Sequence, residues 1–129
     1  MNSKEIKTKL LHYWRFRRRY IYCATEVGKF KADILVSNGE EILEIEVKVS
    51  RGDIVQEKKK KKHFIYHNPS TWYSQFVPNK FYIAVPKNLV PIVTDLTINK
   101  NYGIVQVKKK QITKNRKEVY CKIIKQAKI

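Results

Sequence analysis

Two carboxylates and a lysine in the first half of the chain have a spacing that suits a metal ion beside a phosphate group. Asp33 is followed thirteen residues later by Glu46, and Lys48 stands two residues beyond Glu46. Mg²⁺ binds through one or two carboxylates and fills its other positions with water and substrate phosphate oxygens. Such an ion stabilises negative charge on a phosphate and activates water, and a nearby lysine can orient that water or offset the developing charge. The pattern therefore favours phosphate chemistry.

The acidic residues are concentrated in one window of an otherwise strongly basic chain. Positions 26–57 hold eight acidic and four basic residues, a net charge of −4, whereas the other positions hold three acidic and 24 basic residues, a net charge of +21. A cationic surface attracts a polyanion because neutralising phosphates releases condensed counterions. We therefore expect a phosphate-rich partner, a nucleic acid in the first place, with Mg²⁺ as cofactor and Mn²⁺ as a substitute.

Length and composition indicate one folded domain spanning residues 1–129. The chain is 43% hydrophobic and 30% charged, which suffices for a single core but not for two. It begins without an apolar signal segment, and no apolar run approaches the ~20 residues of a spanning helix, so we expect a cytoplasmic protein with no membrane partner.

Cys23 and Cys121 lack a CxxC spacing and should be buried and unpaired. A homodimer remains open.

Periodicity and turn residues define the elements that must position the three side chains. Ser3 should cap a first helix ending near Arg19, and Asp53 should cap a second one that runs through residues 58–63 towards Tyr66. Strands are expected over residues 20–27, 32–36, 42–49, 80–85 and 102–108, with 118–124 as a strand or frayed helix and 88–96 as a weak helix. The lysines at 108–110 and 114–117 should lie around a solvated turn. This order predicts an α/β fold with a mixed sheet flanked by helices, the second helix being a crossover.

The hairpin register decides whether the carboxylates meet. Alternation along residues 42–49 gives an apolar core face and a charged face that carries Glu44, Glu46 and Lys48. With Asn38 and Gly39 as a two-residue turn, Ser37 pairs with Glu40, Asp33 with Glu44 and Lys31 with Glu46. Like charges opposed in this way require a compensating cation. The alternative is an open face of ordinary solvated side chains, neutralised by Lys31 and Lys48. A one-residue shift of register would move Asp33 to the other face.

A resemblance to a known family is carried by the segments KADILVSNGEEILEIEVKVSRGDI, KKKKKHFIYH, FYIAVP and YGIVQV. Over residues 26–107 the chain resembles the PD-(D/E)XK nuclease superfamily, near its small MmcB-like DNA-repair-type members. The resemblance implies a restriction-endonuclease-like core and a metal-dependent DNA endonuclease that acts in DNA repair, recombination or phage DNA processing. Asp33 and Glu46 would ligate Mg²⁺, and Lys48 would be the catalytic lysine. Glu26 would be an additional catalytic acid, unless Glu5 or Glu44 has that role.

Basic and aromatic clusters supply candidate contacts to the nucleic acid. The first is a set of arginines interleaved with aromatic residues: Arg15, Arg17, Arg18 and Arg19. Lys58 and Lys62 share one stripe of the expected second helix, and His63 adjoins them. His63 and His67 have the spacing of metal ligands, but no third ligand is near in the sequence, which favours a structural role.

Two other classes of function stay open. A catalytically inactive nucleic-acid-binding module of the same fold would need only the basic surface. An assembly protein would instead use the aromatic segment that contains Trp72, Tyr73 and Phe76, which could equally wedge into a duplex or cover the core.

Overall fold

The structure is a computed structural model that describes residues 2–27, 32–57, 78–98 and 100–128. In these residues a six-stranded sheet has its strands in the order of the sequence. They are β1 Tyr22–Val27, β2 Ala32–Ser37, β3 Ile42–Val47, β4 Lys80–Pro86, β5 Gly103–Thr113 and β6 Arg116–Lys125. Strands β3, β4 and β5 are parallel to one another, and the other neighbours are antiparallel. The predicted α/β class with a mixed sheet is confirmed.

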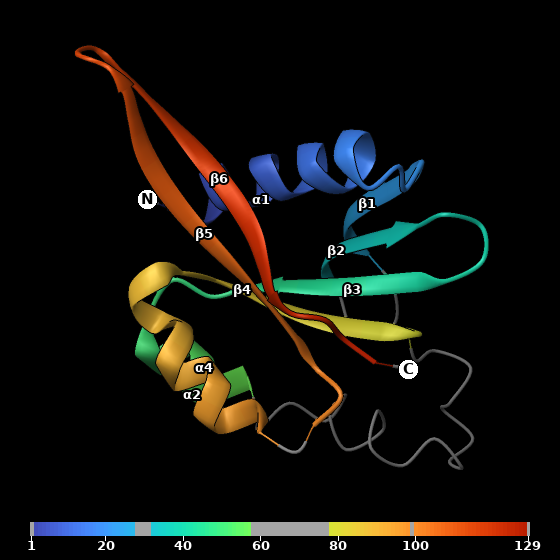
Figure 1. The fold of residues 1–129 in the computed structure, drawn as a ribbon. Coiled ribbons are helices and arrows are strands. Elements are labelled where there is room, and N and C mark those ends of the chain that lie inside the picture. Colours follow the sequence, from blue (N-terminus) through green and yellow to red (C-terminus); the bar gives the residue numbers. More distant parts are fainter. Residues whose placement is uncertain (1, 28–31, 58–77, 99, 129) are drawn as a thin grey trace.

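Helices cover both faces of the sheet (Figure 1). The described helices are α1 Ser3–His12, the π-helical turn η1 Tyr13–Arg17, α2 Arg51–Glu57, the 3₁₀ turn η3 Lys87–Leu89 and α4 Val90–Thr97. On one face, α1 and η1 bury Ile6, Leu10 and Trp14 among the core side chains of the sheet. On the other face, Ile54 of α2 and Val93 of α4 pack in a second apolar cluster. Residues 42–47 therefore lie between two cores.

Both main helices begin earlier than predicted, α1 by one residue and α2 by three. Asn2 caps α1, since its Oδ1 accepts the backbone N–H of Glu5 at 2.9 Å, so Ser3 is the first helical residue and not the cap. At α2, the Ser50 Oγ accepts the N–H of Asp53 at 3.2 Å, which places Asp53 in the first turn. In each case the cap precedes an acidic residue by three positions, as in a capping box. The predicted extension of the second helix to Tyr66 lies outside the described residues.

The β2–β3 register differs by two residues from the one expected. Ser37 pairs with Ile42, and Leu35 pairs with Glu44. The turn is longer than the expected two residues. The Asn38 Oδ1 accepts the backbone N–H groups of Glu40 and Glu41, at 2.9 Å each, and so stabilises the longer turn. An even shift leaves every side chain on its predicted face. The predicted pairing of Asp33 with Glu44 is nevertheless wrong, and so is that of Ser37 with Glu40.

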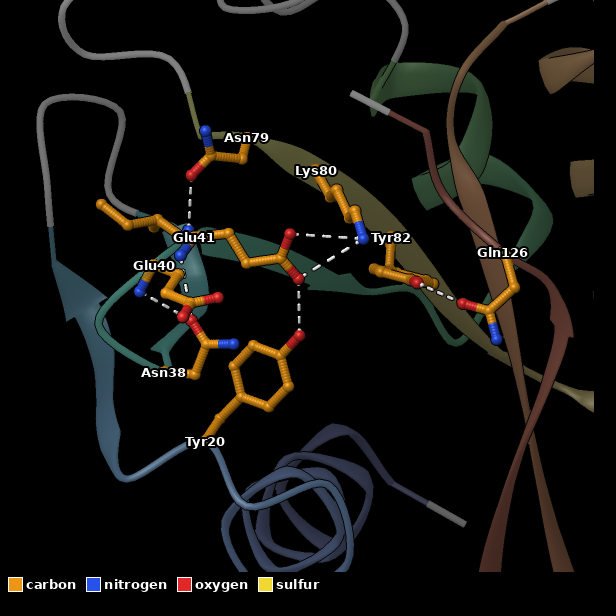
Figure 2. A network of polar contacts seen from close by, with 9 residues as sticks. Tyr20, Asn38, Glu40, Glu41, Asn79, Lys80, Tyr82 and Gln126 are labelled. Atoms are coloured by element: carbon orange, nitrogen blue, oxygen red, sulfur yellow. Dashed lines mark hydrogen bonds and ion pairs between the residues drawn. The ribbon is translucent and has the colours of Figure 1, made fainter.

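A polar network closes the hairpin end of the sheet (Figure 2). The Tyr20 hydroxyl donates to Glu41 Oε1 at 2.6 Å, and Lys80 Nζ lies 3.3 Å from Glu41 Oε2. Asn79 Oδ1 accepts the Ile42 N–H at 2.6 Å. The hydrogen bond from Tyr20 lowers the pKa of Glu41, while burial, followed by this same hydrogen bond, raises the pKa of Tyr20 to about 12. The network joins the end of the first helical segment to the turn and to the start of β4.

Three further expectations can be compared with the structure. Residues 108–110 belong to β5, the exposed turn lies at residues 114–115, and residues 118–124 lie in strand β6. The cysteines are unpaired, as expected, but Cys23 is exposed on the edge strand β1, and Cys121 is only half-buried. No helix within the described segments is long and apolar enough to cross a membrane.

Candidate functional site

Three acidic residues form a row across the first three strands. The β1–β2 register sets Glu26 opposite Asp33, and the β2–β3 register, extended by one residue beyond its last pair, sets Asp33 opposite Glu46. Glu26 adopts a left-handed backbone conformation with φ 54°, which is uncommon for a residue other than glycine. Backbone strain of this kind persists where surrounding structure enforces it and is frequent at functional sites.

The carboxylate of Asp33 is held by three groups. Its Oδ2 accepts the backbone N–H of Val47 at 2.9 Å, its Oδ1 lies 3.4 Å from Lys7 Nζ, and the Glu46 carboxyl shares a hydrogen bond with it. Burial alone would raise the pKa of Asp33, but the Val47 N–H, the Glu46 carboxyl and Lys7 together hold it below its ordinary value. The two carboxyl groups therefore lie beside each other on the same face of β2 and β3.

The charged face of β3 is buried, contrary to the alternative of an open solvated face. Glu44 and Glu46 are each 2% exposed, and Lys48 is 9% exposed. Burial, followed by the carboxylates of Glu57 and Glu44, raises the pKa of Tyr102, which places these two carboxylates near its hydroxyl. Glu44 therefore belongs to the buried surroundings of Tyr102 on the α2 side of the sheet.

Lys48 forms a buried ion pair that the sequence did not indicate. Its Nζ lies 2.8 Å from Glu57 Oε1, and the Glu57 side chain is 3% exposed. The backbone N–H of Lys48 donates to the Ala84 carbonyl at 3.0 Å, which ties this residue to β4. Ile54 and Glu57 stand three positions apart on α2, so both lie on its buried side. That spacing was the signal by which Glu57 could have been found.

Lys7 of α1 is the other residue that the sequence did not indicate. Its Nζ donates to Glu26 Oε1 at 3.0 Å and lies 3.4 Å from Asp33 Oδ1, so it bridges the first two acids of the row. Glu5, by contrast, pairs with Lys109 at 3.3 Å. Of the three candidates for an additional acid, Glu26 is therefore the one joined to Asp33 through a shared partner. Since α1 and β2 are separate in sequence, no local spacing predicts the Lys7 contact.

Of the predicted arginine cluster, Arg18 lies at the other end of the hairpin. All four arginines are exposed: Arg15, Arg17, Arg18 and Arg19. The charge of Arg18 lowers the pKa of Glu41, which places this arginine beside the turn. Asp33 stands four residues before the end of β2 at Ser37, a separation of roughly 13 Å along the strand. Lys58, Lys62 and His63 lie outside the described residues.

The paired carboxyl groups suit Mg²⁺ as a site completed by substrate. Asp33 and Glu46 could supply the one or two carboxylates that Mg²⁺ takes from a protein. In the part of the chain that the structure describes, no group of three or more His, Cys, Asp or Glu residues could hold a metal ion. At a site formed by the carboxyl pair, the remaining ligands of a Mg²⁺ ion would be water and phosphate oxygens.

Comparison with known proteins gives a likeness of fold alone. No protein-family model matches the sequence, and no curated protein matches it. Among solved structures, the chain is similar to a protein of unknown function from Silicibacter pomeroyi, with a TM-score of 0.50 and 14% sequence identity. The match covers 81% of this chain and 58% of that protein, so this chain spans little more than half of its length. The likeness supports the mixed α/β fold.

Proposed function

We propose that this protein is a Mg²⁺-dependent DNA endonuclease. The observation that carries the proposal is the Asp33–Glu46 carboxyl pair, brought together by neighbouring strands and followed two residues later by Lys48. This is the set of side chains on which the resemblance to the PD-(D/E)XK nuclease superfamily rests. The basic charge of the remaining chain supports a phosphate-rich partner.

The carboxyl pair has a stability cost that a binding role would explain. Acidic residues directly opposed on adjacent strands destabilise a sheet, and burial increases the cost of each charge. Here the backbone N–H of Val47 and the ammonium group of Lys7 offset part of that cost. Apolar residues at these positions would make a more stable sheet, and departures from that rule are expected at functional sites.

Each residue of the site has a distinct role in the proposed reaction. Asp33 and Glu46 would hold the Mg²⁺ ion, which would supply stabilisation of negative charge on the phosphate and activation of water. Lys48 would turn its ammonium group from Glu57 towards the phosphate or the attacking water. Glu57 positions Lys48 through the 2.8 Å ion pair, and the exposed arginines contact the DNA backbone away from the reacting bond.

A catalytically inactive DNA-binding module of the same fold is the second candidate. The Lys48–Glu57 ion pair favours it, because a lysine already paired with a buried carboxylate has to exchange that contact to reach a phosphate. The basic surface would suffice for binding in such a module.

The two candidates differ in cleavage. We expect the wild-type protein to cleave at least one member of a panel of linear, nicked, flapped and junction DNA substrates with Mg²⁺, and none in EDTA. Glu46→Gln should reduce the rate about 100-fold or more, because it removes a ligand of the ion that stabilises the transition state. Glu40→Gln, an exposed glutamate of the β2–β3 turn, is the matched control and should cleave normally. Absence of cleavage on the whole panel, or equal rates for Glu46→Gln and wild type, would contradict the proposed activity.

A further inference from the structure

Strands β5 and β6 continue beyond the rest of the sheet as a two-stranded ribbon. The last pair between β4 and β5 joins Pro86 to Val107. From Lys108 onward, β6 is the partner of β5 among the described strands, and their pairing continues to Thr113 and Arg116. Figure 1 shows this ribbon projecting away from the body of the molecule. At about 3.3 Å per residue, residues 108–113 extend roughly 20 Å.

The projecting ribbon is exposed and its charges have one sign. Every residue from 108 to 117 is exposed. This stretch holds six basic residues and no acidic one: Lys108, Lys109, Lys110, Lys114, Arg116 and Lys117. Lys109 pairs with Glu5 at the base, and Arg116 pairs with Glu118 at 2.6 Å. Among the described residues, Lys114 and Lys117 form no ion pair.

The tip of the ribbon is held in one conformation by its own side chains. The Gln111 amide donates to the carbonyl of Thr113 and to that of Lys114, the latter at 3.1 Å. These bonds close the turn at residues 114–115 across the end of the ribbon. A preorganised arm loses little conformational entropy on binding. The tip can therefore present Lys114 and Lys117 to a partner without being reordered.

Protection of free strand edges does not account for this charge pattern. Exposed edges are commonly guarded against pairing with other chains by charged residues. Lysine is especially common in that role, but Lys114 lies in the turn, where there is no strand edge to guard. The uniform positive sign from 108 to 117 is instead complementary to a polyanion.

We propose that the β5–β6 ribbon is an arm that enters the major groove of double-stranded DNA. The major groove of B-form DNA, about 12 Å wide, admits a two-stranded ribbon, and its walls are lined by phosphates that the lysines can neutralise. The major groove of A-form RNA is too deep and narrow for such an arm, so a DNA duplex is the fitting partner. The inference rests on the proposed DNA partner, but it is independent of catalysis.

The first test compares two variants of equal charge in EDTA, where no metal-dependent cleavage occurs. Lys114→Gln/Lys117→Gln neutralises the tip, and Lys87→Gln/Lys128→Gln neutralises two exposed lysines outside the ribbon. Fluorescence anisotropy with a DNA duplex should show affinity for the tip variant reduced on the order of tenfold. The slope of log K against log salt should become shallower by about 0.9 for each lost phosphate contact. The control variant should retain the wild-type affinity and slope.

The second test asks whether the arm occupies the groove. Guanine N7 lies in the major groove, so an inserted ribbon should protect it from methylation by dimethyl sulfate. We expect protection with wild type and with Lys87→Gln/Lys128→Gln, and its loss with the tip variant. An RNA duplex of equal length should be bound with equal affinity by both variants.

Three outcomes would contradict the proposal that the ribbon enters the major groove. These are equal DNA affinity of the tip and control variants, an unprotected guanine N7 in the wild-type complex, and an equal loss of RNA and DNA affinity in the tip variant. Protection without cleavage under Mg²⁺ would leave the arm supported and contradict only the proposed nuclease activity.

Discussion

Single side chains carry most of what distinguishes this domain from an ordinary α/β sheet. Glu46 and Lys48 are buried although both are ionisable, and each is matched by one specific partner. Such residues are rarely buried unless they are paired. The pairing with Glu57 is the contact whose energetic role can be measured without any ligand.

Breaking the Lys48–Glu57 pair from one side should be costly. Glu57→Leu leaves the Lys48 ammonium group buried without its carboxylate, and we expect a loss of about 3 kcal/mol in the free energy of unfolding. The double variant Lys48→Met/Glu57→Leu replaces both charges by apolar side chains and should recover most of this loss. Urea denaturation of the wild type, both single variants and the double variant completes the cycle. Additive single effects would show that the 2.8 Å contact contributes nothing.

Tyr20 should make stability depend on alkaline pH. Burial and the hydrogen bond to Glu41 raise its pKa to about 12 in the folded chain, from an ordinary value of 10.0. A raised folded pKa gives stabilisation that is complete below pH 10.0 and is lost as the pH rises towards 12. The stability difference between wild type and Tyr20→Phe, about 2 kcal/mol at neutral pH, should therefore shrink across this window. Denaturant titrations at pH 8 and pH 11 measure it, and a constant difference would refute the assignment.

At the scale of elements, turns and caps were the least predictable features. Strand positions followed from alternation, and the α1 stripe Ile6, Leu10 and Trp14 is buried as expected. The β2–β3 register was missed because Asn38 caps the backbone of the turn, a preference that competes with the two-residue Asn-Gly turn. Asp33 still meets a carboxylate, since the shift of two residues preserves its face.

The backbone conformations of the β2–β3 turn and of α2 can be tested by replacing one glycine in each with alanine. Gly39 has φ 94° in the turn with no neighbour within 4 Å of an added Cβ, so Gly39→Ala should cost about 1 kcal/mol through strain alone. Gly52 lies in α2, where an added Cβ meets only the Ser50 Oγ at 4.0 Å, so Gly52→Ala should stabilise by roughly 0.5–1 kcal/mol. Thermal or urea unfolding compares them. Effects of the same sign would contradict the assigned backbone conformations.

At the scale of the whole molecule, the net charge and the fold class could be predicted from the sequence, but the contacts between helices and strands could not. Composition alone gave the net charge of +17, and the order of periodic segments gave the mixed sheet. The Lys7–Asp33 and Lys48–Glu57 contacts join helices to strands. They depend on how these elements pack, which no local pattern encodes. The location of Arg18 beside the β2–β3 turn, away from the carboxyl pair, has the same origin.

The net charge of +17 should make the folded chain sensitive to salt. Self-repulsion destabilises a compact state of high net charge, and added salt screens it. Raising NaCl from about 20 mM to about 500 mM should raise Tm by a few degrees, because the Debye length falls from roughly 20 Å to less than 5 Å. Differential scanning calorimetry measures the shift. A fall in Tm would instead indicate that specific ion pairs dominate the electrostatics of this fold.

The most direct measurement of the central claim locates a bound cation at the Asp33–Glu46 pair. Mn²⁺, the expected substitute for Mg²⁺, broadens NMR signals of nearby nuclei, so a titration reports the site even when binding is weak. We predict that the amide signals of Asp33, Glu46 and Val47 broaden first, that Asp33→Asn and Glu46→Gln abolish this effect, and that Glu40→Gln leaves it intact. Broadening centred on other residues, or unchanged in Asp33→Asn, would contradict the assignment of this carboxyl pair as the metal site.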